Sequence, residues 1–343
     1  MDTENLCGLT SNELYDLIRT YDYNYSYAVK IANSIYKKRS SDISDFRNIP
    51  EKLKGILKSI SQTGILHFTK CEVSADKSVK YLFQTESGKR FESVYLPDGK
   101  RHTVCVSTQS GCRMGCLFCL SGRYGFHGNL STGEIISQIL GAPLADKVTH
   151  VVFMGMGEPM DNLDNVLKAC NILTAEWGLA ISPKNITVST VGIGPGIERY
   201  LKESSCNLTL SLHSPFSEER QRFVPMEKKY HAGDLLNMMK DYPLKKGRRI
   251  TVAYVMIEGL NDSDEHLKGL IEMLKDTSIR VNLLPFHSIN GDSLHSSSPS
   301  RMQLFKHNLV ISGISASIRK SRGEDISAAC GLLAAGSGKH SGH

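Results

Sequence analysis

From Thr103 onward the chain alternates short β-branched runs with longer amphipathic stretches, and this pattern restricts the fold more than any other feature. Apolar strands separated by helices are typical of parallel βαβ units, and six or so such units predict a full or partial α/β barrel. The expected strands are Thr103–Thr108, His150–Met154, Asn185–Thr190, Asn207–Leu212, Ile250–Met256, Arg280–Leu284 and a last one around Ile314–Arg319.

Two segments with different patterns precede the barrel. Residues 1–65 contain helical stretches, the first opening at Asn12 and Glu13, and we expect a helical accessory domain. Residues 66–100 alternate apolar and polar side chains between turn signals, which predicts a small antiparallel β extension. The fold class is therefore α/β, a partial (β/α)6-type barrel at 101–343 with these two additions.

Length and charge exclude several classes of protein. A chain of 343 residues with 40% hydrophobic content can bury a large core, so disorder is not expected. There is neither an apolar run near 20 residues nor a signal-peptide pattern, which predicts a cytoplasmic protein without a membrane partner. Nine cysteines in a reducing compartment point to metal binding or catalysis rather than structural bridges, and the net charge of +6 permits an anionic partner.

The strongest motif follows the first barrel strand. Cys112, Cys116 and Cys119 have a C-x3-C-x2-C spacing that can hold three irons of a [4Fe-4S] cluster and leave one open. A three-cysteine zinc site with His127 as a fourth ligand, or unligated thiols, are the alternatives. The spacing, with Phe118 before the last cysteine, resembles that of radical S-adenosylmethionine enzymes, in which the open iron binds this cofactor.

Polar motifs also follow the next three strands, where parallel strands collect their chemistry. Gly157 and Glu158 lie in GMGEP, where glycine allows close backbone approach and a carboxylate suits an ammonium group. Ser189, Ser211 and His213 end the following two strands and are candidates for ribose or carboxylate contacts. Each of these residues taken alone is more often structural.

Together the motifs resemble one family over nearly the whole chain, the RlmN/Cfr radical-SAM adenosine methyltransferases. The segments that carry the resemblance are FESVYLP, CVSTQSGCRMGCLFC, GNLSTGEI, FMGMGEP, STVGIGPGI, LSLHSPFSEER, YVMIEGLNDSDEHL and RKSRGEDISAACG.

The resemblance implies catalytic roles for residues outside the cluster loop. Cys330 matches the cysteine that is methylated by a first S-adenosylmethionine, and a second molecule per turnover is cleaved reductively to give a radical. Cys105 matches the cysteine that releases the product through a transient disulfide with Cys330, and Glu92 matches the proton acceptor. The ring carbon that is methylated, C8 or C2 of adenine, is not nucleophilic, which explains the need for a radical route.

The resemblance also implies cofactor contacts at Gly157, Glu158, Ser189, Ser211, Leu212 and His213. The family has an Asn that touches the adenine after the last main strand. This chain has His287 there, while Asn282 lies earlier, and an imidazole still offers one donor and one acceptor.

The implied partners are ribosomal RNA or transfer RNA and an electron donor such as flavodoxin, and we expect a monomer. Ser214 and Phe216 favour the branch that makes 8-methyladenosine and confers antibiotic resistance over the C2-specific housekeeping branch. A radical-SAM enzyme on a non-RNA substrate and a zinc RNA-binding protein remain the other readings. Four basic runs, at 37–39, 220–229, 245–249 and 319–322, are solvated faces or phosphate contacts.

Overall fold

The computed structural model describes residues 3–245, 247–288 and 293–335, and one ten-stranded sheet forms its centre. The sheet has the order β14-β13-β12-β11-β10-β9-β6-β5-β4-β3, with β14 and β3 at its edges in the described part of the chain. The predicted α/β class, with an open barrel rich in parallel strands, is confirmed.

Strand β6 and the strands from β9 to β14 run parallel to one another and form the barrel part of the sheet. Their bounds are β6 (Arg101–Cys105), β9 (His150–Phe153), β10 (Ile186–Thr190), β11 (Asn207–Ser211), β12 (Ile250–Met256), β13 (Arg280–Pro285) and β14 (Ala316–Ile318). Most of their apolar side chains are buried, as expected for strands covered on both faces.

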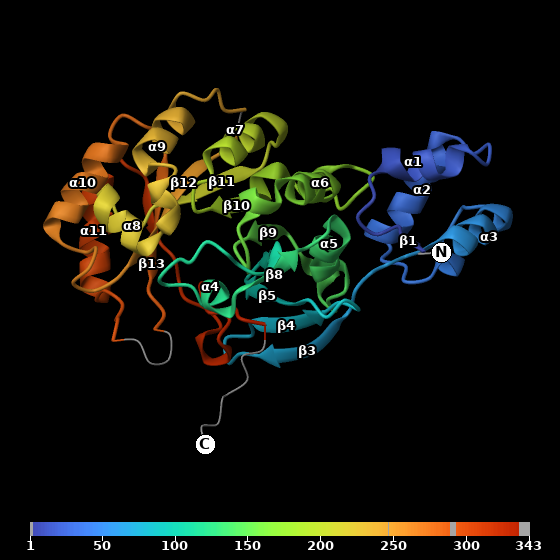
Figure 1. Ribbon diagram of the computed structural model, residues 1–343, viewed down its shortest axis with the longest axis horizontal. Helices are drawn as coiled ribbons and strands as arrows, with labels where there is room; N and C mark the ends of the chain where they lie inside the picture. Colours follow the sequence, from blue (N-terminus) through green and yellow to red (C-terminus); the bar gives the residue numbers. More distant parts are fainter. Residues whose placement is uncertain (1–2, 246, 289–292, 336–343) are drawn as a thin grey trace, which may run out of the picture.

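Helices connect these parallel strands and lie outside the sheet (Figure 1). They are α5 (Thr132–Leu140), α6 (Leu163–Thr174), α7 (Gly194–Glu203), α8 (Ser217–Phe223), α9 (Ala232–Lys240), α10 (Asp264–Leu274) and α11 (Pro299–Ile311). The first connection is the most elaborate, because it also contains β7 (Gln109–Gly111), α4 (Leu120–Tyr124) and β8 (Phe126–Asn129). The cysteine motif lies inside it.

Three antiparallel strands continue the sheet beyond β6. β3 (Phe68–Val73), β4 (Val79–Gln84) and β5 (Arg90–Asp98) pair in sequence, and β5 pairs with β6. The antiparallel register of β5 and β6 places Val94 opposite Cys105. The predicted β extension is therefore continuous with the barrel sheet, and it carries Glu92 to the barrel.

The N-terminal segment lies at one end of the elongated molecule (Figure 1). It comprises α1 (Ser11–Arg19), α2 (Tyr25–Tyr36) and α3 (Glu51–Ile60), closed by the pairing of β1 (Glu4–Asn5) with β2 (Ser61–Gln62). The first helix begins at Ser11, one residue before the predicted opening, because Thr10 and Glu13 form a capping box.

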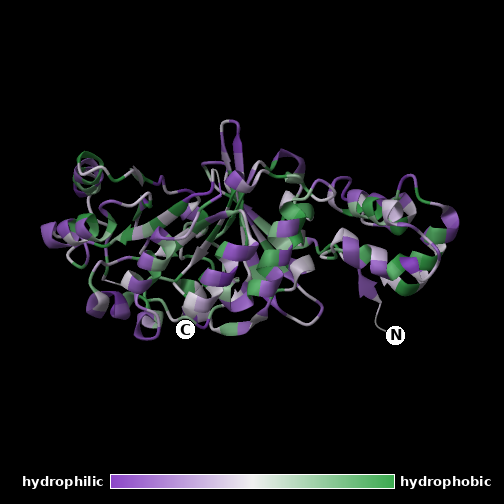
Figure 2. Cartoon of the chain, turned by 90° about the horizontal axis from the view of Figure 1, so that it is seen from above, coloured by the Kyte–Doolittle hydropathy of each residue, from purple (hydrophilic) through white to green (hydrophobic). Residues whose placement is uncertain are grey.

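Apolar residues concentrate between the helices and the central sheet, while polar residues cover the outer helix faces (Figure 2). All nine cysteines are free thiols. None of the described helices combines the length and the apolarity that crossing a bilayer requires.

Candidate active site

The cysteine loop is fixed at both ends by backbone contacts. The amide of Cys112 donates to the carbonyl of Gly125 at 3.1 Å, and the amide of Leu117 donates to Phe223 at 3.0 Å. Gly111, just before the loop, has φ +76°, and a Cβ there would lie 1.5 Å from the Gly125 oxygen. This approach requires glycine, so the entry to the loop is set by the sequence.

The three thiols of this loop influence one another. Burial, together with a charge on Cys119, raises the pKa of Cys112 to about 12. Burial also raises the pKa of Cys116, with further contributions from Cys119 and Cys112. Three thiolates gathered here would repel one another without a cation, so the site suits a bound metal centre.

A multi-iron cluster fits this donor set better than a single ion. Among the described residues, no three His, Cys, Asp or Glu side chains are grouped so that they could hold one ion. His127, the fourth ligand of the zinc alternative, lies with its Nε2 3.1 Å from the carbonyl oxygen of Tyr124. Three thiols without a described fourth ligand fit a [4Fe-4S] cluster, in which each thiolate binds a different iron.

The C-terminal segment lies against the cysteine loop. The amide of Leu120 donates to the Gly331 carbonyl at 2.7 Å, and the hydroxyl of Ser121 donates to the Leu333 carbonyl at 2.7 Å. Cys330 therefore stands next to a residue bonded to the helix that follows Cys119. Its thiol is accessible to solvent, yet enough protein surrounds it for desolvation to raise its pKa.

Glu92 and Cys105 lie on one face of the antiparallel part of the sheet. Val94 is opposite Cys105, and Glu92 is two residues before Val94 on the same strand, so all three share a face. The Glu92 carboxylate is buried and accepts a hydrogen bond from the amide of Ala334 at 3.1 Å. The C-terminal segment is thus held between Glu92 and the cysteine loop.

Cys105 is buried, and burial raises the pKa of its thiol. The second contribution is a charge on Cys330, which shows that the two thiols lie within electrostatic range of each other. No disulfide joins them in this structure.

Lys80 is a member of this cluster that the sequence analysis missed. Its Nζ lies 3.7 Å from Glu92 Oε1 and 3.2 Å from Glu72 Oε2, and its side chain is only 13% exposed. The carboxylate of Glu92 therefore has a buried cationic partner. In the sequence Lys80 occupies an ordinary polar position of an alternating strand, and only the cross-strand pairing reveals its neighbour.

Glu158 lies in the turn that directly follows β9, and it is fully enclosed. Its two carboxylate oxygens accept the amides of Met160 and Val191, each at 2.9 Å, and burial raises its pKa to about 7. Gly157 has φ +97°, and a Cβ there would lie 2.5 Å from the side chain of Gln109. A buried carboxylate with an elevated pKa is suited to a cationic ligand group.

Ser189 and Ser211 lie near the carboxyl ends of neighbouring parallel strands, β10 and β11, and both are half-buried. Leu212 is fully buried behind them. His213 has φ +62°, accepts the Val255 amide at Nδ1, and leaves its buried Nε2 without a partner among the described atoms. Burial lowers its pKa to about 3, so a neutral ring presents an Nε2–H donor beside Phe118, 4.4 Å between ring centroids.

His287 lies directly after β13 and contacts the segment that leads to Cys330. Its Nε2 is 2.8 Å from the hydroxyl of Ser321, its Nδ1 is 3.6 Å from Glu324, and burial lowers its pKa. Asn282 instead bonds Ser317 on the neighbouring strand β14.

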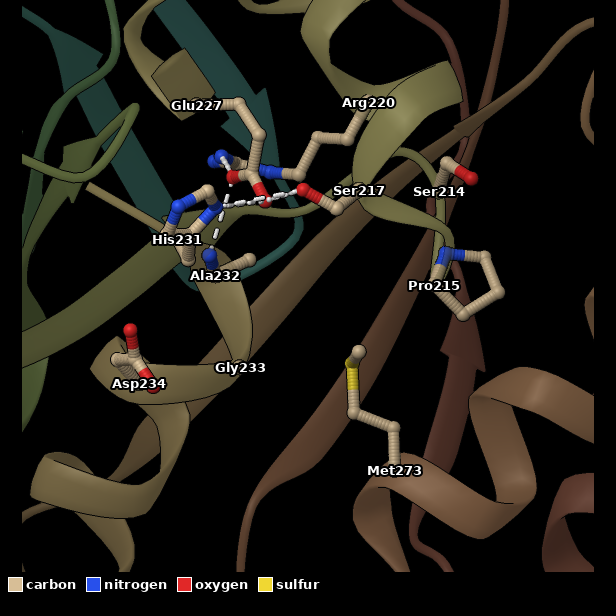
Figure 3. A pocket seen from close by; sticks show the side chains of 10 residues that line it. All are labelled: Ser214, Pro215, Ser217, Arg220, Glu227, His231, Ala232, Gly233, Asp234 and Met273. Carbon is tan, nitrogen blue, oxygen red and sulfur yellow. Dashed lines mark hydrogen bonds and ion pairs between the residues drawn. The ribbon is translucent and has the colours of Figure 1, made fainter. Parts of the chain in front are cut away.

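Arg220 corrects the interpretation of the basic run 220–229 as a solvated or phosphate-binding face. It is 1% exposed and pairs with Glu227, which is 2% exposed. Its other nitrogens donate to the carbonyls of Val191, Ser211 and Leu212 at the rim of β10 and β11, 2.6 to 3.0 Å away. This Arg220–Glu227 pair forms the wall of a pocket of about 350 Å³ (Figure 3).

Comparison with known proteins agrees with this site. The sequence profile of the radical SAM superfamily matches residues 106–271, which include the cysteine loop, Glu158 and the rim. A protein of Parabacteroides distasonis named "Probable dual-specificity RNA methyltransferase RlmN" is 41% identical over 333 residues, covering 97% of each chain. The chain is a member of the RlmN/Cfr family.

Further relatives have the same extent as this chain. A "Dual-specificity RNA methyltransferase RlmN" from Pelobacter propionicus is 37% identical over 96% of this chain and 95% of its own. The crystal structure of a radical SAM methyltransferase from Sphaerobacter thermophilus superposes with a TM-score of 0.90 at 34% identity, over 97% of this chain and 100% of that one. The whole fold, N-terminal helices included, is thus shared with a radical SAM methyltransferase.

Proposed function

We propose that this protein methylates an sp2 ring carbon of an adenosine in RNA, with the methyl group carried on Cys330. The observation that carries the proposal is the position of Cys330. Its segment is bonded to the cysteine loop on one side and to Glu92 on the other, and its thiol is accessible. Membership in the family named for RNA methyltransferases supports the same conclusion.

Cys330 takes the methyl group first. Its thiolate attacks the methyl of one S-adenosylmethionine, forming a carbon–sulfur bond and releasing S-adenosylhomocysteine. A [4Fe-4S] cluster held by Cys112, Cys116 and Cys119 would supply the electron that cleaves a second S-adenosylmethionine. Glu158 would hold the ammonium group of that molecule, with Gly157, Ser189, Ser211, Leu212 and His213 as its further contacts and His287 as the replacement for the family's adenine-binding Asn.

Glu92 and Cys105 complete the reaction after the methyl carbon has bonded to the adenine. Glu92 accepts the proton that leaves the ring, and Lys80 balances its charge at 3.7 Å. Cys105 then attacks the Cys330 sulfur as a thiolate, so that the S–S bond forms as the S–C bond breaks. The freed carbon takes a proton to become the methyl group of the product, and the unpaired electron left by the radical addition would return to the cluster.

The RNA substrate is proposed to be large-subunit ribosomal RNA or transfer RNA, gripped by the accessory domain at 1–65. Tyr21 and Tyr25 of this domain are 42% and 40% exposed and offer aromatic surface. A flavodoxin-like electron donor, action as a monomer and action in the cytoplasm belong to the same proposal. The β extension at 66–100 and the barrel at 101–343 complete the proposed domain division.

The position of the methylated ring carbon, C8 or C2, has to be determined by chromatography of the product, because the contacts of Ser214 and Phe216 do not distinguish the two. Ser214 bonds Glu219 at 2.9 Å, and the ring of Phe216 packs edge-on against His266, 5.3 Å between centroids. Glu219 belongs to α8 and His266 to α10, and neither contact involves a catalytic cysteine. They give no structural basis for choosing C8, and with it resistance, over C2.

The test uses anaerobically purified protein with methyl-labelled S-adenosylmethionine. We expect label on Cys330 in peptide mass spectrometry before RNA is added, and methyladenosine in digested ribosomal RNA afterwards, where chromatography separates the C2 from the C8 isomer. An unlabelled Cys330 would favour a radical-SAM enzyme on another substrate. Stoichiometric zinc without iron would favour a zinc-bearing RNA-binding protein.

The release step has its own test. We expect Cys105→Ala to become trapped on RNA as a covalent adduct visible on a denaturing gel, because no thiol is left to free Cys330. Cys71→Ala, which removes an exposed thiol on β3, is the control and should turn over normally. Multiple turnover by Cys105→Ala would contradict the assigned role.

A further inference from the structure

We propose that Phe126 and Arg113 form a stacking platform for an RNA base that flanks the target adenosine. The inference rests on the proposed function and extends it, because it names a place where the enzyme holds a second nucleotide of its substrate. It starts from an exposed aromatic ring beside the cysteine loop.

Phe126 is held close to the first cysteine by strand pairing. In the antiparallel pair of β7 and β8 it lies opposite Gly111, the residue before Cys112. Its neighbour Gly125 accepts the amide of Cys112. The ring is 38% exposed, so a large apolar side chain stands open to solvent at the edge of the candidate active site.

Arg113 lies over this ring and is itself fixed. Its guanidinium carbon is 5.0 Å from the Phe126 ring centroid. Two of its nitrogens donate to the carboxylate of Asp161, at 2.8 and 2.5 Å, while its side chain remains 57% exposed. Gln109 also donates to Asp161 at 2.8 Å, so the acceptor is held from a second side. The cation and the ring are therefore arranged before any ligand arrives.

The chemistry of this pair selects a base rather than a phosphate. The charge of Arg113 is already matched by a bidentate carboxylate, which weakens its attraction for a phosphate group. What remains available is a planar guanidinium beside an aromatic ring, and RNA-binding proteins stack unpaired bases on such surfaces.

The position fits a reaction on a base that has left its stack. An adenosine must be turned out of the RNA to reach Cys330, and its neighbours lose a stacking partner when this happens. A platform at the edge of the cysteine loop replaces that partner for one of them. Stacking of a base on an aromatic side chain is worth about 1 to 3 kcal/mol by alanine substitution.

Phe126→Ala, Phe126→Leu and Phe126→Tyr test the proposal on a transcript of large-subunit ribosomal RNA. We expect KM for RNA to rise roughly 5- to 150-fold in the Ala variant, which is the stacking free energy expressed as a ratio, with kcat at saturating RNA retained. The Leu variant keeps apolar volume without a flat ring and should show a similar rise. The Tyr variant should stay near wild type.

Two measurements show whether the ring acts on RNA or on the fold. Cluster iron and RNA-free methylation of Cys330 should equal wild type in all three variants. Phe216→Ala, which truncates an equally exposed ring (39%) between α8 and α10, should leave KM unchanged. An unlabelled Cys330 in wild type would be a failure of the proposed function, not of the platform.

Three results would overturn the platform. An unchanged KM in Phe126→Ala would show that no base stacks there. Normal KM in Phe126→Leu would assign the ring to apolar packing. Loss of iron or of Cys330 methylation in the Ala and Leu variants would assign it to support of the cysteine loop.

Discussion

Removal of the Arg220 guanidinium should be among the most damaging single changes in the barrel. Arg220→Met leaves the buried carboxylate of Glu227 without its guanidinium, with only the exposed imidazole of His231 3.6 Å away, and removes the donors to three carbonyls at the ends of β10 and β11. Removing one partner of a buried ion pair costs about 3 to 5 kcal/mol. A domain is stable by about 5 to 15 kcal/mol in total, so a large share of the stability is lost.

Urea unfolding of anaerobic protein, followed by the fluorescence of the single tryptophan and by circular dichroism, measures this cost. With a slope of about 3 kcal/mol per molar, the midpoint should fall by roughly 1 to 1.7 M. The exposed pair of Lys202 and Glu198 is the control, because both side chains are more than half exposed. Lys202→Met should cost less than about 1 kcal/mol.

A double-mutant cycle then tests the reasoning itself. Glu227→Met removes the buried charge that Arg220→Met leaves behind, so the double variant should be more stable than the sum of the single effects predicts, by at least about 2 kcal/mol. It should remain less stable than wild type, because the three carbonyls still lack a donor. Additive effects, or a loss of stability below 1 kcal/mol in Arg220→Met, would show that the buried Arg220–Glu227 pair does not stabilise the barrel in the way argued above.

Three other changes have defined outcomes. The pKa of Glu158 is raised to about 7 in the folded protein, so the folded state binds a proton more tightly than the unfolded state does. The free energy of unfolding of the wild type, relative to Glu158→Gln, should therefore fall by about 2 kcal/mol between pH 5.5 and pH 8.5, as measured by urea titration. Lys80→Met should slow RNA methylation in a single-turnover assay, because Glu92 loses the cation that lies 3.7 Å from its carboxylate. Gly331→Ala should slow the methyl labelling of Cys330, because a Cβ at this position (φ +85°) would lie 2.7 Å from a carbonyl oxygen of the cysteine loop. Gly88→Ala is the control, since Gly88 has a similar φ of +84° but a Cβ there would meet only open space.

The barrel strands could be predicted because their signal is local. Each is a short apolar run that ends at a polar or glycine-rich motif, and the structure places them within two or three residues of the prediction, with Ile250–Met256 unchanged. The order of the motifs along the chain also predicted that they meet at one end of the sheet, since parallel strands place their carboxyl ends together. Cys112, Glu158 and His213 accordingly follow three of these strands.

The residues that sequence reasoning missed depend on partners distant in the chain. Arg220 begins a basic run that has the composition of a solvated surface, and its burial is decided by Glu227 and by strand ends it meets only in the fold. Phe126 has the opposite character. An aromatic residue between glycines and polar residues is expected to pack, and only the surface shows that its ring stays open.

The antiparallel extension has a specific task that the topology makes clear, which is to hold the segment that carries Cys330. Asp76 in the turn between β3 and β4 accepts the amide of Gly323, and Asp325 accepts the hydroxyl of Ser74, at 3.0 and 2.6 Å. Arg322 donates to the end of β5. These bonds fix the residues before Cys330 independently of the cysteine loop, which fixes those after it. In the proposed reaction Cys330 accepts a methyl group, meets RNA and then meets Cys105. The fold attaches it at both sides while its own thiol stays free, and the strands that anchor it are the same ones that position Glu92.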